Sequence, residues 1–135
     1  MDADTAAEPG AERADLERLS QKFQRELNAG LVGLVLLAVL EQAAEDLYGY
    51  QIAKRLQDLA DGSPPVKQGA LYPVLRQLSA NGLLASRIVP SYAGPPRRYY
   101  RITASGRAAL AEWRDIWRST RNFVDGFTEA NGASP

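Results

Sequence analysis

The chain has 135 residues and a formal net charge of zero, and its 45% hydrophobic content is enough for the core of a single domain. It contains neither cysteine nor histidine, which excludes disulfides, thiolate zinc sites and catalysis by cysteine or histidine side chains. We expect a protein with no metal site and no cofactor.

The positive charge is concentrated in one part of the chain. Residues 61–110 carry seven basic side chains and one acidic one, net +6, whereas residues 1–20 carry two basic and six acidic ones, net −4. The two remaining segments, 21–60 and 111–135, are each net −1. Binding to a nucleic-acid backbone requires a local stripe of cations, so the zero net charge does not argue against a DNA partner.

The N-terminal part of the chain predicts a tail and two helical segments. Residues 1–10 are mostly Ala, Asp, Glu, Pro and Gly, a composition typical of a disordered tail. Residues 11–28 predict an N-terminal extension helix, because apolar side chains recur three and four positions apart at Leu16, Leu19, Phe23 and Leu27. The next stretch, Leu31 to Leu40, is apolar on nearly all sides and predicts a buried core helix, which Gly30 and Gly33 could loosen.

The same apolar stretch bears on the expected location of the protein. Leu31 to Leu40 is too short to cross a bilayer. The residues before it are polar and mixed in charge, without the basic segment that begins a signal peptide. We expect a cytoplasmic protein with no membrane partner.

Two shorter helices follow a connector over residues 45–49. The first has an inward stripe of Ile52, Leu56 and Leu59 and ends at the helix breakers of residues 61–65. The second begins near Lys67 and runs to about Ala80. Its core side consists of Leu71, Leu75 and Leu78, and its opposite side carries Gly69, Tyr72, Pro73 and Arg76.

Two residues on that opposite side have alternative interpretations. Pro73 lies inside a helix, where proline is unfavourable, and it either kinks the helix locally or uses the kink to aim its neighbours at DNA. Arg76 is either a solvated charge or a contact to a base or phosphate.

The next segment predicts a basic β-hairpin. Strands are expected over residues 85–89 and 98–102, around a tip over residues 90–97 that contains Gly-Pro-Pro. Arg97 and Arg98 either keep an edge strand soluble or contact phosphates or the minor groove, and the stiff tip favours contact. Residues 29–102 therefore have the order of a winged helix-turn-helix: helix, turn, strand, basic tip, strand.

The chain ends in an amphipathic helix over residues 103–128 and a tail over residues 129–135. Thr103 to Gly106 is expected to cap the helix. Apolar positions along it are spaced by three and four residues and form a seam, which consists of Leu110, Trp113, Trp117, Thr120, Val124 and Phe127. A seam of this kind needs a partner, so we expect a homodimer held by Leu110, Trp113, Val124 and Phe127.

Four motifs make the chain resemble the PadR family of bacterial transcriptional regulators, in its short subfamily with one C-terminal helix. The motifs are Leu36–Leu40, Tyr48–Ile52, Gly69–Leu78 with Gly82-Leu83 behind it, and Gly94–Arg107. The resemblance covers about residues 30–118 and implies a mostly α (α+β) fold with a two-stranded β-wing and a C-terminal dimerisation helix. It also implies a homodimer that represses promoters and releases DNA when it binds a small aromatic or drug-like molecule.

The chain departs from the family pattern at two places. The usual Ser-Pro pair at the start of the recognition helix is replaced by Lys67-Gln68, so the cap is lost and a cation is gained. A cation at a helix N-terminus is mildly unfavourable unless a phosphate binds there and neutralises it. The extension over residues 11–28 is also longer than in the short members.

The pattern and the resemblance together assign expected functional residues. The expected DNA contacts are Tyr48, Lys67, Gln68, Gly69, Ala70, Tyr72, Pro73, Arg76, Arg97 and Arg98. Tyr48 either brings its hydroxyl to a phosphate or fills the core. Trp113 is expected in the dimer core. In similar regulators that bind planar drugs, a tryptophan at the place of Trp117 stacks on the ligand between the subunits, so Trp117, with Trp113, is a candidate effector contact.

We therefore expect a DNA-binding transcriptional regulator, a repressor that binds a pseudo-palindromic operator as a homodimer and responds to a small planar aromatic effector. An alternative is a winged helix that docks an acidic protein partner through its basic wing. The two interpretations differ in the salt dependence of binding to duplex DNA. An enzyme is not expected, because the sequence offers no nucleophile–base pair and no metal cluster.

Overall fold

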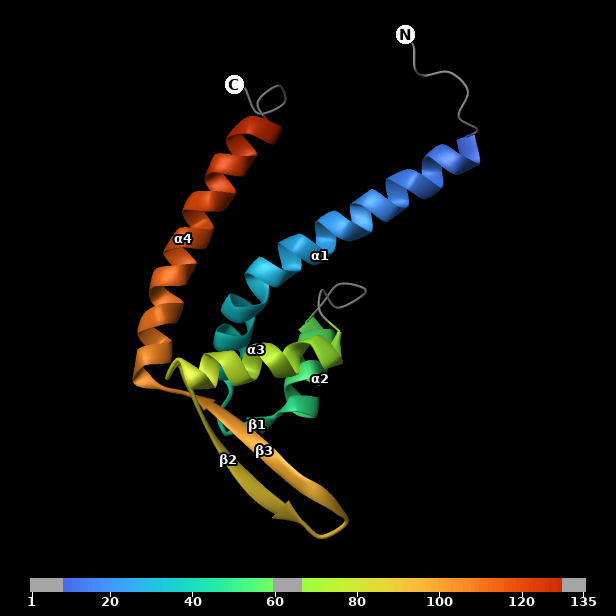
Figure 1. Cartoon of the computed structure of the whole chain (residues 1–135). Helices are drawn as coiled ribbons and strands as arrows, with labels where there is room; N and C mark the ends of the chain where they lie inside the picture. The colour runs from blue at the N-terminus through green and yellow to red at the C-terminus, as the bar shows by residue number, and fades with distance from the viewer. Residues whose placement is uncertain (1–8, 60–66, 130–135) are drawn as a thin grey trace. The chain divides into compact units, whose positions relative to one another are not determined.

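The computed structural model describes residues 9–59 and 67–129. In this part of the chain, helices and a small sheet follow one another in the order α1, β1, α2, α3, β2, β3, α4 (Figure 1). Their bounds are α1 Pro9–Gln42, β1 Leu47–Tyr48, α2 Gly49–Leu59, α3 Gln68–Ala80, β2 Leu84–Ser91, β3 Gly94–Ile102 and α4 Ala104–Thr128. The chain divides into two compact units after Leu31.

The first unit contains the N-terminal part of α1. Its polar side is stabilised by pairs one turn apart, such as the ion pair of Arg18 with Asp15 at 3.3 Å and that of Lys22 with Glu26 at 3.9 Å. Its predicted apolar stripe is exposed, and Phe23 is 64% accessible. The stripe consists of Leu16, Leu19, Phe23 and Leu27. This part of α1 therefore presents an apolar surface that its own unit does not cover.

Helix α1 is continuous through Gly30 and Gly33, so the two expected helical segments form one helix. It begins at Pro9, inside the tail expected over residues 1–10, whereas residues 1–8 and 130–135 lie outside the described residues. The division into an extension over 11–28 and a winged helix over 29–102 is not marked by a helix end, because glycine within a long helix costs only about 1 kcal/mol.

The core of the second unit forms around the C-terminal part of α1. Leu36 and Leu37 are completely buried there, and the core also takes in one face of every other element. The remaining buried residues are Val32, Val39, Leu40, Leu47, Ile52, Leu56, Leu71, Leu75, Leu78, Leu84, Tyr100, Ile102 and Leu110. The predicted core side of α3 is confirmed. Leu59 is 72% exposed at the end of α2, so the inward stripe of that helix is shorter than predicted.

The apolar content of α1 has a structural explanation in this core. One 18-residue window of the helix has a mean hydropathy of 1.4, which by length and composition alone would suit a membrane span. Five residues of α1, however, are buried against the sheet and the other helices of the second unit. Packing in the core of the second unit therefore accounts for the part of the apolar run from Val32 to Leu40.

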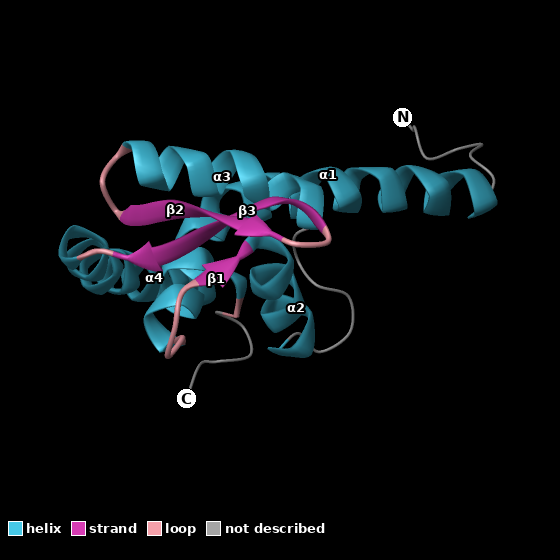
Figure 2. Cartoon of the chain, turned by 90° about the horizontal axis from the view of Figure 1, so that it is seen from below, coloured by secondary structure: helices cyan, strands magenta, loops and turns pink. Residues whose placement is uncertain are grey.

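The sheet has three antiparallel strands in the order β1-β3-β2 (Figure 2). The hairpin of β2 and β3 is the expected two-stranded wing, and β1 adds a third strand where the sequence predicts a connector. Leu47 pairs with Tyr100 and Tyr48 with Tyr99, which joins the start of α2 to the middle of β3. A strand of two residues is too short to show the alternation by which strands are predicted.

The hairpin is longer than predicted, and its turn is shorter than the tip expected over residues 90–97. Only Tyr92 and Ala93 separate β2 from β3, whereas Gly-Pro-Pro at residues 94–96 belongs to β3. Pairing runs from Val89 with Arg97 to Ser91 with Gly94, so β3 holds one more residue than β2 in this interval. Proline is tolerated at such bulges because it has no N–H to contribute to the ladder.

The ends of α3 and α4 are fixed by local chemistry. Lys67 occupies the N-cap position of α3, and its side chain makes no hydrogen bond to the helix. This confirms that the usual side-chain cap is lost. At α4, Thr103 Oγ1 accepts from the Gly106 N–H at 3.0 Å and donates to the Gly82 carbonyl at 2.7 Å. A side chain at Gly106 would overlap the carbonyl of Leu83, so this close approach of the helix requires glycine.

Candidate nucleic-acid interface

Helix α3 presents a polar face to solvent. Leu71, Leu75 and Leu78 are buried, and the helical period places the predicted contact residues on the opposite side. All of those on α3 are exposed, namely Gln68, Gly69, Ala70, Tyr72, Pro73 and Arg76, together with Lys67 just before the helix. The helix continues through Pro73, whose missing N–H leaves the Gly69 carbonyl without its usual partner in the helix.

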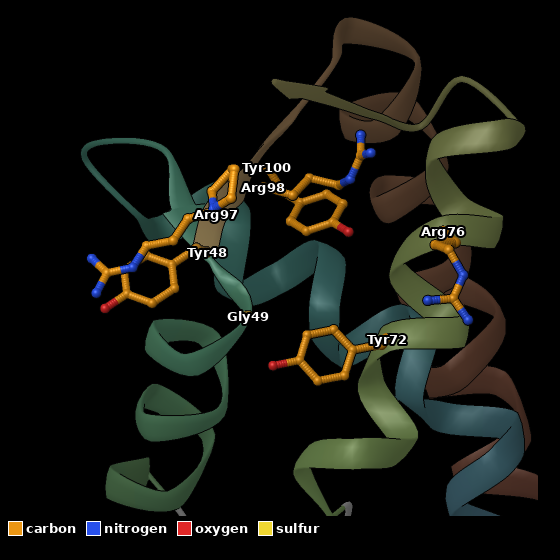
Figure 3. A pocket seen from close by; sticks show the side chains of 8 residues that line it. Tyr48, Gly49, Tyr72, Arg76, Arg97, Arg98 and Tyr100 are labelled. Atoms are coloured by element: carbon orange, nitrogen blue, oxygen red, sulfur yellow. The ribbon is translucent and has the colours of Figure 1, made fainter. Parts of the chain in front are cut away.

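A groove of about 300 Å³ lies between α3, the start of α2 and β3 (Figure 3). It brings together five of the predicted contact residues from three different elements. Its lining consists of Tyr48, Gly49, Tyr72, Arg76, Pro96, Arg97, Arg98 and Tyr100. A second hollow of about 420 Å³ shares Arg76, Arg98 and Tyr100 with it. The predicted residues at the start of α3, Lys67 to Ala70, and Pro73 do not line the groove.

Tyr72 and Gly49 join α3 to α2. A side chain at Gly49 would overlap the ring of Tyr72, so the two helices approach this closely only because position 49 is glycine. The amide of Gln68, one turn earlier on α3, donates a hydrogen bond to the Tyr72 hydroxyl at 3.2 Å. Tyr72 is 36% exposed, so its ring serves as packing as well as surface.

Arg97 and Arg98 point in opposite directions, because neighbouring side chains of a strand alternate between its faces (Figure 3). Arg98 lies on the α3 side with Tyr100 and donates to the Ser86 hydroxyl at 3.1 Å. The guanidinium carbon of Arg97 lies 4.5 Å from the centroid of the Tyr48 ring. The hairpin therefore offers one arginine on each of its faces.

The arginines of the groove lack the carboxylate partners that some other arginines of the chain have. Arg87 pairs with Asp46 at 3.0 Å, Arg114 with Glu41 at 3.6 Å and Arg118 with Asp115 at 3.6 Å. Within residues 9–59 and 67–129, no carboxylate lies within ion-pair distance of the three groove arginines, which are Arg76, Arg97 and Arg98. Their charge is therefore available to an anion from outside.

Tyr100 lines the groove but is not among the predicted site residues. Alternation along β3 predicts only that one of Tyr99 and Tyr100 is buried, and it assigns that residue no function. Burial raises the pKa of the Tyr100 hydroxyl, and the nearby Arg98 and Arg76 lower that pKa in part. The hydroxyl stays protonated at neutral pH and can donate a hydrogen bond to an anionic oxygen. Gly49, Pro96 and Ser86 were missed as well, because their place depends on tertiary packing.

Among the described residues, no group of three or more acidic, cysteine or histidine side chains could hold a metal ion. The groove is built instead from arginines, the hydroxyls of Tyr72 and Tyr100 and the N-terminus of α2. These are the groups that bind phosphate oxygens, because each of them donates hydrogen bonds.

The residues expected in the dimer and effector sites lie along α4. Leu110 is completely buried in the core of its own chain, so within the single chain it packs inward and presents no surface. Trp113 packs against this core, with its ring beside Gly33 of α1. Trp117 is half-buried, whereas Val124 and Phe127 are 45% and 74% exposed.

The far part of α4 has further apolar side chains that the seam did not include. Ile116 is 58% exposed and Phe123 is 67% exposed. The rings of Phe123 and Phe127 contact each other edge to face, with centroids 5.0 Å apart. We name the exposed apolar surface of α4 the α4 face, which consists of Ile116, Phe123, Val124 and Phe127.

Comparisons with known proteins agree with this architecture. Residues 36–112, more than half of the chain, match the model of the transcriptional regulator PadR-like family. The chain is 42% identical over 83 residues to the transcriptional regulator Rv3488 of Mycobacterium tuberculosis, an alignment that covers 59% of this chain and 72% of that protein.

Solved structures show the same likeness. The crystal structure of a PadR family transcriptional regulator from Eggerthella lenta superposes with a TM-score of 0.69 at 32% identity, covering 86% of this chain and 97% of the other. A transcriptional regulator from Clostridium thermocellum superposes with the same TM-score of 0.69 at 27% identity, covering 76% and 98%. The mostly α winged-helix fold and the expectation of a regulator, not an enzyme, are confirmed. The chain belongs to the PadR-like family of transcriptional regulators.

Proposed function

We propose that the chain binds duplex operator DNA as a homodimer and represses transcription, releasing the DNA when a planar aromatic effector binds. The observation that carries the DNA part is the groove with three arginines that lack carboxylate partners among the described residues. Arg76 belongs to the exposed face of α3, and Arg97 and Arg98 belong to the hairpin. A regulator of this kind acts on DNA in the cytoplasm, which is the location we propose.

The arrangement suits a winged helix that places α3 in the major groove. The exposed start of α3, with Gly69 and Ala70, has small side chains that allow the backbone to approach DNA closely. Arg76, one to two turns further on, is in reach of a base edge or phosphate, and the hairpin arginines are in reach of the flanking backbone. Lys67 at the uncapped helix N-terminus would be stabilised by a phosphate there.

The homodimer is supported by apolar surfaces that the single chain leaves exposed. The α4 face is one, and the stripe on the N-terminal part of α1 from Leu16 to Leu27 is the other. Isolated exposed apolar residues need no explanation, but two helical stripes favour a partner. In a two-fold dimer the recognition helices would reach successive major grooves about 34 Å apart, which requires a pseudo-palindromic operator.

The effector is proposed on Trp117. This side chain is half-buried in the single chain and lies one turn beyond Trp113, which the core holds. Two copies of Trp117 that meet across a two-fold axis would form a slot with aromatic walls, suited to a planar apolar ligand. Such a ligand can release DNA only if the slot differs between the DNA-bound and free spacing of the α3 helices.

The direct test is selection of bound fragments from the genome of the source organism, followed by footprinting and titration of salt. We expect a protected palindrome and a steep fall in affinity with salt. The triple variant Arg76→Ala, Arg97→Ala, Arg98→Ala should lose binding to operator and mixed-sequence duplexes alike. The matched control removes three paired or remote arginines, Arg87→Ala, Arg114→Ala and Arg118→Ala, and should bind within a few-fold of wild type.

Two outcomes would contradict the proposal. If both triple variants lose DNA binding equally, general positive charge and not the groove is responsible. If the wild type binds no duplex at low salt but captures acidic proteins through Arg97 and Arg98, the winged helix docks an acidic partner instead.

A further inference from the structure

Tyr48 lies in a cluster of aromatic and basic side chains at the edge of the groove, on the strand face that carries Arg97 and Tyr99. Its ring contacts that of Tyr99 edge to face, with centroids 5.3 Å apart, and stacks near Tyr50 at 6.4 Å with an interplanar angle of 21°. Its backbone pairs with Tyr99, and its N–H donates to the side chain of Gln51 at 3.1 Å. The position and orientation of the Tyr48 ring are therefore set by three elements, β1, α2 and β3.

Arg97 rests on this ring. Its guanidinium carbon lies 4.5 Å from the centroid of the Tyr48 ring, within the range of a cation–π contact (Figure 3). Arg97 itself is exposed, and the part of the chain that the structure describes offers it no carboxylate within ion-pair distance. The ring thus restrains the side chain without neutralising its charge.

Arg87 provides an internal comparison. It lies over the ring of Tyr99 at 5.2 Å, on the neighbouring strand, but it also forms an ion pair with Asp46 at 3.0 Å. Two arginines therefore rest on two touching tyrosine rings, and only Arg97 keeps an uncompensated charge. An unrestrained arginine loses the freedom of several rotatable bonds when it binds a phosphate, so a ring that restrains it beforehand favours binding.

We infer that Tyr48 is a positioning residue for Arg97: its ring, and not its hydroxyl, holds the guanidinium at the mouth of the groove in the orientation that meets a DNA phosphate. The inference rests on the proposed DNA-binding function. It changes the role expected for Tyr48, from a phosphate contact through its hydroxyl to a support for the arginine that makes the contact.

The test is a double-mutant cycle in the full-length protein, read out as affinity for a short labelled duplex of mixed sequence across a range of salt. Arg97→Ala should weaken binding and lower the salt slope by about one. Tyr48→Leu should weaken binding about two- to five-fold, the equivalent of a partly exposed cation–π contact. The variant with both changes should bind like Arg97→Ala alone, because Tyr48 acts only through that arginine.

Conservative variants separate the ring from the hydroxyl and from the charge. Tyr48→Phe keeps the ring and should bind like wild type, and Tyr48→Trp should bind at least as well. Arg97→Lys keeps the positive charge at this exposed position. Because an ammonium group stacks less well on a ring than a guanidinium group, this variant should lose part of the affinity for DNA. Arg101→Ala removes an exposed arginine of the same strand face, and its effect should simply add to that of Tyr48→Leu.

A second measurement needs no DNA. In the free protein, ring current from Tyr48 should shift the NMR signals of the Arg97 side chain. The shift should persist in Tyr48→Phe and vanish in Tyr48→Leu, whose fold is checked by its unfolding midpoint. Additive effects in the cycle, or a loss in Tyr48→Phe as large as in Tyr48→Leu, would overturn the inference while leaving DNA binding intact. A wild type that binds no duplex would instead remove the proposed function, and this inference with it.

Discussion

Helices α3 and α4 each place one side in the same core, and they differ in what the other side carries. The outward side of α3 has small, polar and basic residues, among them Gly69 and Arg76. The outward side of α4 has Ile116, Phe123 and Phe127, all more than half exposed. An exposed cation stays hydrated until an anion takes the place of the water around it. Exposed apolar surface, in contrast, is stabilised by any partner that removes that surface from water.

This difference separates the two kinds of partner that we propose. The α3 side suits a polyanion, whose affinity would fall with salt. The α4 face suits a second copy of the chain, whose association would depend little on salt. Mutations on the shared inner side should affect both functions through folding, and mutations on either outer side should affect one function only.

The largest effect is expected at the shared inner side. Leu110→Ala removes a completely buried side chain from the core and should lower the free energy of unfolding by about 2–5 kcal/mol. Denaturant titration at several protein concentrations measures this change. Phe127→Ala, at an exposed position of the same helix, is the matched control and should change the unfolding of the isolated chain little. Equal losses from the two variants would mean that the end of α4 is also part of the core.

The next largest effect concerns the α4 face. Changing both Phe123 and Phe127 to Asp should weaken the proposed dimer by at least about 2 kcal/mol, roughly thirty-fold in Kd, because charge would be buried in an apolar interface. Sedimentation over a range of concentrations measures the dissociation. The fold should survive, since neither residue belongs to the core. A wild type that remains monomeric at micromolar concentration would show that this face has another partner.

The seam illustrates how far the sequence alone leads. Its spacing of three and four residues correctly predicted one apolar side of α4. Periodicity cannot say which chain covers that side, so Leu110 and Phe127 received the same role although one is buried and the other is exposed. Burial depends on where the helix leaves its own core, and that point is set by tertiary packing.

The hairpin illustrates a second limit. Turn propensity placed the tip at Gly-Pro-Pro, but strand pairing continues past both prolines to Ser91 and Gly94. The basic strand and the exposed face of α3 were predicted correctly, because both follow from local patterns. The contact of Tyr48 with Arg97 and the ion pair of Asp46 with Arg87 were not predicted, because they join segments far apart in sequence.

A smaller effect is expected where α3 meets α2. Gly49→Ala would push against the Tyr72 ring and should cost about 1–3 kcal/mol of stability, with a loss of DNA affinity as α3 shifts. Gly69→Ala is the matched control on the outer side of α3, where no atom lies near the added carbon. It should raise stability by about 0.5–1 kcal/mol through helix propensity. Unfolding titrations compare the two, and a stabilised Gly49→Ala would mean that the Tyr72 ring moves aside freely.

The smallest effect is expected for Trp117, where the α4 face meets the core. Trp117→Ala should weaken the binding of a planar ligand by about 0.5–1.5 kcal/mol beyond the loss of buried area, because one aromatic wall of the proposed slot is removed from each subunit. Tryptophan fluorescence during titration with a panel of aromatic acids and cationic dyes measures this, and labelled duplex in the same solution reports release of DNA. Trp113→Phe keeps an aromatic ring beside Gly33 and serves as the control. If Trp117→Ala leaves ligand affinity and DNA release unchanged, Trp117 contributes only to the packing of the dimer. The α3 side would then still bind DNA and the α4 face would still bind a second chain, but no effector site at Trp117 would couple the two.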